Sequence, residues 1–111
     1  MNKEERDVLL CIPEEWECPL EITRTAVALT HVEASKPFTS IVYILLCKLE
    51  KQGLVERQDS EDPKKLPRFR LTQAGVIEKA AVFAESPAIE AAVNQANLDI
   101  ETEILSEAPI G

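Results

Sequence analysis

The sequence predicts a mainly α-helical domain with one small β-hairpin and a C-terminal helical extension. Apolar residues recur at steps of three and four over most of the chain, which is the helical period. Only three of the 111 residues are glycine. The one region where apolar and polar residues alternate is short and is interrupted by turn-forming residues. A chain of this length corresponds to about one domain.

Two helices are predicted in the first part of the chain. Asn2 is a suitable N-cap for a helix over about residues 3–12, and Pro13 ends it. Pro19 begins a second helix at a position where its missing N–H costs nothing, and this helix ends near Thr30.

The third helix is the best-defined element of the sequence. A polar, proline-terminated turn over residues 31–37 precedes it, and Thr39 is a natural N-cap for a helix from Ser40 to Gln52. Gly53 then lies where a left-handed C-terminal cap is needed.

A hairpin and a fourth helix follow. Residues 54–58 and 69–72 are predicted to pair as two strands around the charged loop 59–65. Thr72 caps a helix that runs to the break at residues 86–87. Three helices followed by a two-stranded wing make a winged helix-turn-helix, whose third helix normally enters the DNA major groove.

The segment 87–111 is predicted to be an acidic helix and tail, attached to a winged helix-turn-helix domain over residues 1–86. Its apolar residues recur at steps of four, three, four and four: Ile89, Val93, Ala96, Ile100 and Ile104. Such a seam requires a partner surface, so we expect this segment to be the dimerisation element of a homodimer.

The net charge of −8 is unevenly distributed. Residues 1–35 carry a net charge of −5 and residues 71–111 one of −6, whereas residues 36–70 carry +3, from eight basic and five acidic side chains. This asymmetry indicates a localised surface for a polyanion, and the alternative is an ordinary solvated loop that is basic.

Two motifs resemble those of bacterial winged-helix regulators. Tyr43, Leu46 and Leu49, followed by Gly53, resemble the PadR pattern in which a tyrosine and two leucines anchor the third helix and a glycine leads into the wing. The segment Phe69–Gly75 is similar to the aromatic-x-Leu-Thr-x-x-Gly run that closes the wing in the PadR and MarR families.

The resemblance covers residues 38–76 and implies a transcriptional regulator, expected to be a repressor, whose third helix and wing bind double-stranded DNA. We expect basic and hydroxyl side chains of these two elements to contact phosphates: Lys36, Thr39, Ser40, Lys48, Lys64, Lys65, Arg68 and Arg70. The first two turns of the third helix contain no Arg, Asn or Gln, so we expect little hydrogen-bonded reading of base edges.

A second hypothesis stays open, in which the winged helix is a protein–protein interaction module that does not bind DNA. The net acidity and the apolar third helix favour it, and the basic stretch over residues 64–70 opposes it.

The sequence does not indicate an enzyme, a cofactor or a metal. It contains no glycine-rich phosphate loop, no paired-carboxylate motif and no H-E-x-x-H. His31 stands apart from the cysteines in the sequence, and no two cysteines are at C-x-x-C spacing, so a zinc site is not expected. Cys11 and Cys47 are expected in the core. A redox-sensing thiol at Cys18 has no support from the sequence. Trp16 is predicted to cover the core or an interface. A charged N-terminus and the lack of an eighteen-residue apolar run predict a cytoplasmic protein with no membrane contact.

Overall fold

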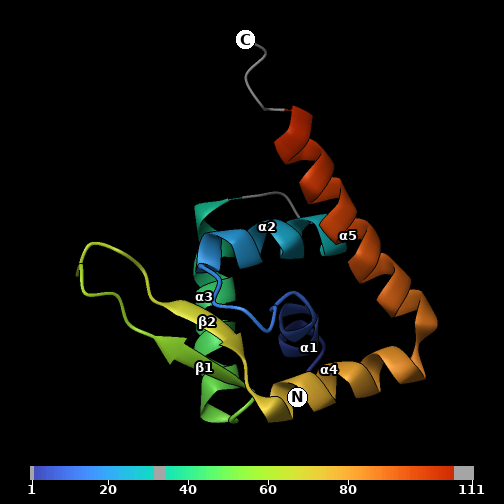
Figure 1. Cartoon of the computed structure of the whole chain (residues 1–111), viewed down its shortest axis with the longest axis horizontal. Helices are drawn as coiled ribbons and strands as arrows, with labels where there is room; N and C mark the ends of the chain where they lie inside the picture. Colours follow the sequence, from blue (N-terminus) through green and yellow to red (C-terminus); the bar gives the residue numbers. More distant parts are fainter. Residues whose placement is uncertain (1, 32–34, 107–111) are drawn as a thin grey trace.

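The computed structural model describes residues 2–31 and 35–106. Its elements are α1 (Lys3–Leu10), α2 (Pro19–Thr30), α3 (Lys36–Lys51), β1 (Val55–Gln58), β2 (Arg68–Leu71), α4 (Gln73–Glu85) and α5 (Pro87–Ser106). Figure 1 shows α1, α2 and α3 grouped beside the hairpin, with α4 and α5 continuing away from it. The predicted fold class, mainly α-helical with a small hairpin and a helical extension, is confirmed.

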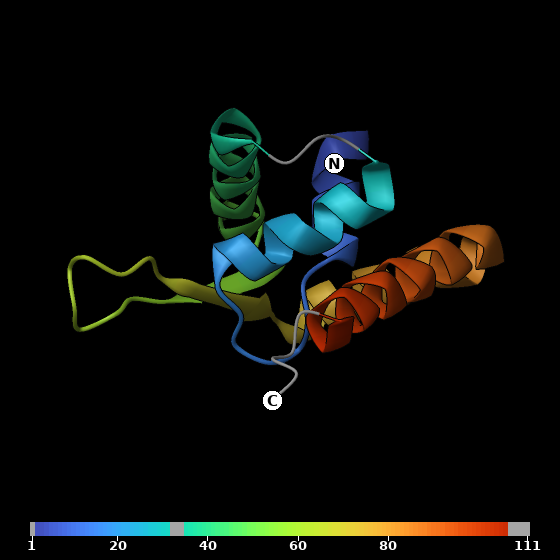
Figure 2. The ribbon, with the colours of Figure 1, turned by 90° about the horizontal axis from the view of Figure 1, so that it is seen from above.

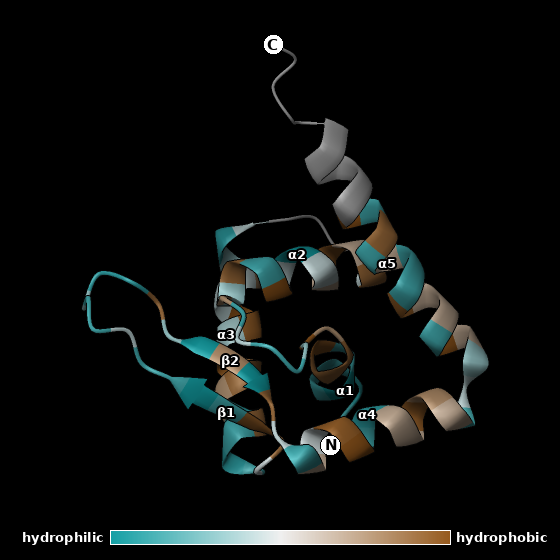
Figure 3. Ribbon diagram, viewed as in Figure 1, coloured by the Kyte–Doolittle hydropathy of each residue, from teal (hydrophilic) through white to brown (hydrophobic). Residues whose placement is uncertain are grey.

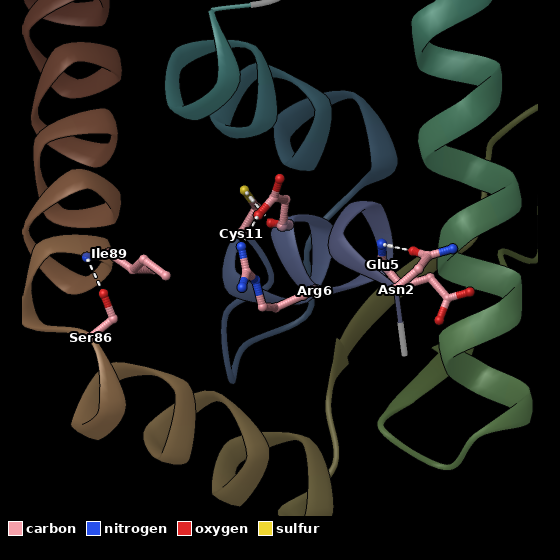
Figure 4. A network of polar contacts seen from close by, with 7 residues as sticks. Asn2, Glu5, Arg6, Cys11, Ser86 and Ile89 are labelled. Carbon is pink, nitrogen blue, oxygen red and sulfur yellow. Dashed lines mark hydrogen bonds and ion pairs between the residues drawn. The ribbon is translucent and has the colours of Figure 1, made fainter.

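Most of the predicted helix boundaries are also confirmed. The side chain of Asn2 accepts a hydrogen bond from the backbone N–H of Glu5 at 2.8 Å, which caps α1 (Figure 4). Thr72 caps α4 in the same way, with its hydroxyl accepting from the N–H of Gly75 at 3.1 Å. Gly53 follows α3 with a φ of +78°, as a left-handed cap requires.

The start of α3 differs from the prediction. The helix begins at Lys36 and is capped by Ser35, whose hydroxyl accepts from the N–H of Phe38 at 3.2 Å. Pro37 therefore lies in the first turn, where a proline nitrogen has no helical partner to lose. The predicted start at Ser40 with Thr39 as the cap is wrong because the proline is part of the helix and does not end the turn before it.

The core lies between the first three helices and the inner face of the hairpin. Its fully buried side chains include Leu9, Ile12, Ile22, Val42, Leu46, Leu49, Val55 and Phe69. The ring of Tyr43 meets that of Phe69 edge-on, with the centroids 6.0 Å apart. Cys11 is buried as predicted, but Cys47 is only half-buried because it lies on the outward side of α3.

The loop between α1 and α2 adds a third line of backbone to the hairpin. The two strands are antiparallel, and Val55 pairs with Leu71. On the other side of β2, Glu17 and Phe69 exchange two backbone hydrogen bonds of 2.9 Å, and the N–H of Leu71 donates to the carbonyl of Pro13 at 3.0 Å. Strand β2 is therefore held on both sides.

Helix α5 turns back and lies along α2. Ser86 separates it from α4, and the Ser86 hydroxyl accepts from the N–H of Ile89 at 3.4 Å (Figure 4). Val93 and Ala96 are each only 2% exposed. Figures 1 and 2 both show the wing and α5 extending from opposite sides of the central helices, so α5 leaves the hairpin and the adjacent α3 uncovered.

Candidate nucleic-acid interface

Helix α3 has a buried face and a solvent-facing one. The buried side chains are Val42, Leu45, Leu46 and Leu49. The opposite face exposes Lys36, Ser40, Ile41, Ile44, Lys48 and Lys51. This second set, which we call the outward face of α3, lies next to the wing because α3 packs against β1.

Four of the predicted phosphate-contacting residues lie on α3. Lys36 and Lys48 are exposed and extend from the two ends of the helix. The hydroxyls of Thr39 and Ser40 donate to backbone carbonyls one turn earlier, at 3.1 and 3.2 Å. These two side chains keep acceptor capacity, but their donors are used inside the helix.

The start of α3 presents few free amides to an anion. Pro37 has no N–H, and the N–H of Phe38 is bonded to Ser35. The positive charge at this end of the helix therefore comes mainly from Lys36 and from the helix dipole.

The wing presents three of its predicted basic residues to solvent: Lys64, Lys65 and Arg68. Asp62 shapes the turn that displays the lysines. Its carboxylate accepts from the N–H of Lys64 at 2.9 Å, and its carbonyl accepts from the N–H of Lys65 at 3.0 Å. Figure 3 shows that the wing loop is hydrophilic along most of its length.

Arg70 is engaged within the chain. Its guanidinium pairs with Glu56, which is its cross-strand partner, and lies 4.3 Å above the ring of Trp16. This arrangement ties the α1–α2 loop to the wing. Two intramolecular partners thus hold the guanidinium, and the expected phosphate contact by Arg70 stays a prediction. Trp16, half-buried beneath it, covers the base of the wing.

Several residues of this surface were not identified from the sequence. Lys51, Ile41 and Ile44 belong to the outward face, and their helical spacing from Lys48 was the signal that could have found them. Arg57 had no such signal, because its partners Glu50 and Asp59 lie on α3 and in the wing. Glu50 first and then Asp59 raise the pKa of Arg57, and the pair with Glu50, at 3.5 Å, joins the wing to α3.

The predicted dimerisation seam lies partly inside the chain. Val93 and Ala96 are buried where α5 lies along α2, so they are not accessible to a second chain in this arrangement. Ile89 and Ile100 are half-buried, and Ile104 lies outside the residues whose side chains the structure describes. An apolar repeat predicts that a helix face is buried but does not identify the surface that buries it.

The part of the chain that the structure describes contains neither a metal-binding cluster nor a membrane-spanning helix. Over residues 2–31 and 35–100, whose side chains the structure describes, there is no group of three or more His, Cys, Asp or Glu side chains arranged to hold a metal ion. No helix among those residues is long and apolar enough to cross a membrane.

Comparison with known proteins identifies the architecture. No protein-family model and no curated protein matches the sequence. Among solved structures, a PadR-like transcription factor from bacteroid fragilis has a TM-score of 0.57 at 19% identity, covering 83% of this chain and 87% of that one. The transcriptional regulator SlyA has a TM-score of 0.57 at 20% identity, covering 96% and 69%.

A MarR-family transcriptional regulator from a Rhodococcus species has a TM-score of 0.50 at 19% identity. The match covers 98% of this chain and 64% of that one. At these identities the likeness concerns the fold. The chain therefore has the winged helix-turn-helix fold of PadR-like and MarR-family transcription factors.

Proposed function

We propose that this protein is a DNA-binding transcriptional regulator that acts as a repressor by occupying duplex DNA, and that it is not an enzyme. The observation that carries the proposal is the exposure of basic side chains on two adjacent elements, α3 and the wing, in a chain whose net charge is −8. The names of the structures it resembles, which describe transcription factors and regulators, support the same role.

The dimensions of α3 suit this role. Its 16 residues extend about 24 Å at a rise of roughly 1.5 Å per residue, and the major groove, about 12 Å wide, accepts an α-helix. In the proposed complex, Lys36 at one end of α3 and Lys48 and Lys51 at the other contact phosphates that border the groove, and Lys64, Lys65 and Arg68 of the wing contact the adjacent backbone.

A homodimer completes the proposal. Two-fold symmetry would place two copies of α3 about 34 Å apart, which is one turn of DNA. The half-buried Ile89 and Ile100 are the members of the α5 seam on which such a contact would rest, since Val93 and Ala96 are covered by the chain itself.

The test compares two variants that change the net charge equally. Lys64→Gln/Lys65→Gln removes two charges from the wing, and Ala91→Glu/Asn94→Glu adds two acidic charges on the exposed side of α5 opposite Val93. Affinity for mixed duplex fragments is measured between about 50 and 200 mM salt, and the mass of the saturated complex gives the number of chains bound.

The wild-type protein is expected to bind in a strongly salt-dependent manner. The wing variant should bind about tenfold more weakly and should lower the slope of log affinity against log salt by about 2 per chain, because each lysine–phosphate contact contributes about 1. The α5 variant should retain wild-type affinity and slope. The proposal is overturned if no duplex is bound at low salt, or if the two variants lose affinity equally.

Protein–protein recognition is the second candidate function. Leu20, Ile44 and Leu66 are each about half exposed, and exposed apolar side chains favour a protein partner where they form a contiguous patch. Failure of duplex binding in the experiment above would favour this candidate.

A further inference from the structure

The centre of the outward face of α3 is apolar. Ile44 is 55% exposed and Ile41, one turn earlier and toward α1, is 47% exposed. Neither belongs to the hydrophobic core, which takes Val42, Leu45 and Leu46 from the same helix. Large apolar side chains are thus displayed on the side of α3 that would face base edges.

Lysines flank Ile44 along the helix axis. Lys36 lies eight residues before it and Lys48 and Lys51 lie four and seven residues after it, which corresponds to about 12, 6 and 10 Å at the α-helical rise. An apolar side chain at the position of Ile44 would therefore have basic side chains one to two turns away on both sides of it along the helix.

Hydrogen-bonded reading has few donors available at this position. The Ser40 and Thr39 hydroxyls donate within the helix, and the exposed lysines are placed for phosphates. The apolar group that a major groove offers is the 5-methyl of thymine, and apolar side chains contact it directly.

We propose that Ile44, extended by Ile41, recognises thymine methyl groups in the major groove, so that the preferred duplexes carry thymine opposite the centre of α3. The inference rests on the proposed function and specifies its sequence preference. Ile44 buries a methyl group that cytosine lacks, while the lysines supply affinity that is independent of sequence.

The experiment removes the methyl group without changing base pairing. Duplexes enriched from a random pool by the full chain are amplified once with thymidine triphosphate and once with deoxyuridine triphosphate. Affinities for the two products are measured with the wild-type protein, with Ile44→Ala and with the control Leu98→Ala. Leu98 is also 55% exposed, on α5.

The wild-type protein should bind the uracil duplex about fourfold more weakly for each methyl group it buries. Ile44→Ala should lower the ratio of the thymine to the uracil affinity, and Leu98→Ala should keep the wild-type ratio.

Equal wild-type affinity for the two duplexes, or an undiminished ratio in Ile44→Ala, would overturn the inference while duplex binding itself stands. If no duplex is enriched, both the inference and the proposed function are wrong, and a protein partner becomes the occupant of this face.

Discussion

Gly53 and Gly75 meet different backbone requirements. Gly53 has a φ of +78° and open space around it, so only its backbone conformation restricts the residue. Gly75 lies in the first turn of α4, where a Cβ would come within 2.0 Å of the carbonyl oxygen of Leu54. The glycine of the Leu-Thr-x-x-Gly motif is therefore needed for the close approach of α4 to the start of β1.

Gly75→Ala should consequently lower the free energy of unfolding by at least about 2 kcal/mol, because backbone must move to admit the methyl group. Gly53→Asn should cost less than about 1 kcal/mol, since asparagine tolerates left-handed backbone. Urea unfolding of the two variants checks the difference. A Gly75→Ala protein as stable as the Gly53→Asn protein would contradict the account.

Cys11 should make stability depend on alkaline pH. Burial raises the pKa of its thiol from 9.0 to about 12, and the thiol donates to the carbonyl of Asp7 at 3.2 Å (Figure 4). The pKa of the thiol is higher in the folded than in the unfolded protein. Its contribution to the free energy of unfolding is therefore complete below pH 9 and is lost as the pH rises toward 12, at about 1.4 kcal/mol per pH unit.

The comparison of wild type with Cys11→Ala measures this effect. The half-buried Lys79, whose pKa is lowered mainly by desolvation and raised by Cys11, acts in the opposite direction, so the difference between the two proteins includes the interaction of the thiol with Lys79. Between pH 8 and 10 the wild type should lose about 1.4 kcal/mol relative to the variant. Parallel stability curves would show that the thiol is not buried as described.

At the scale of elements, α5 is part of the folded body and is not only an extension. Val93 and Ala96 complete the covering of α2, whereas Leu98 faces away from it. Val93→Ala should therefore destabilise the protein by about 2 kcal/mol, and Leu98→Ala by less than about 0.5 kcal/mol. Chemical unfolding of the two variants measures this; an equal cost would mean that α5 does not pack on α2.

Because α5 packs on α2, its removal is not a clean test of self-association. Truncation after Ser86 would remove the cover of α2 together with any contact between chains, so a change in mass could reflect unfolding. Substitutions at the half-buried Ile89 and Ile100 disturb the body less and are better suited to this question.

At the scale of the whole molecule, the sequence predicted what is decided locally. Caps such as Asn2 and Thr72, the glycine after α3 and the apolar spacing act within a few residues, so the order of elements followed from them. The predicted start of α3 was wrong because Ser35 and Thr39 are both suitable N-caps. Pro37 is compatible with a helix that begins at Lys36 and with one that begins at Ser40.

Contacts between distant segments were not predictable in this way. The bridge between Glu17 and Phe69 and the stacking of Arg70 on Trp16 join the α1–α2 loop to β2, more than fifty residues apart. Nothing in the local pattern of either segment encodes the other. For the same reason, the basic residues of the candidate site could be predicted from their charge, but the contacts of Arg70 with Glu56 and Trp16 could not be predicted.

The position of Trp16 also has a practical consequence. It is the one tryptophan of the chain, and it lies under the Arg70 guanidinium where the wing joins the helices. The protein thus carries an intrinsic fluorophore at the base of its wing. Its emission can report, without a label, whether a ligand that engages the wing disturbs the attachment of the hairpin to the body.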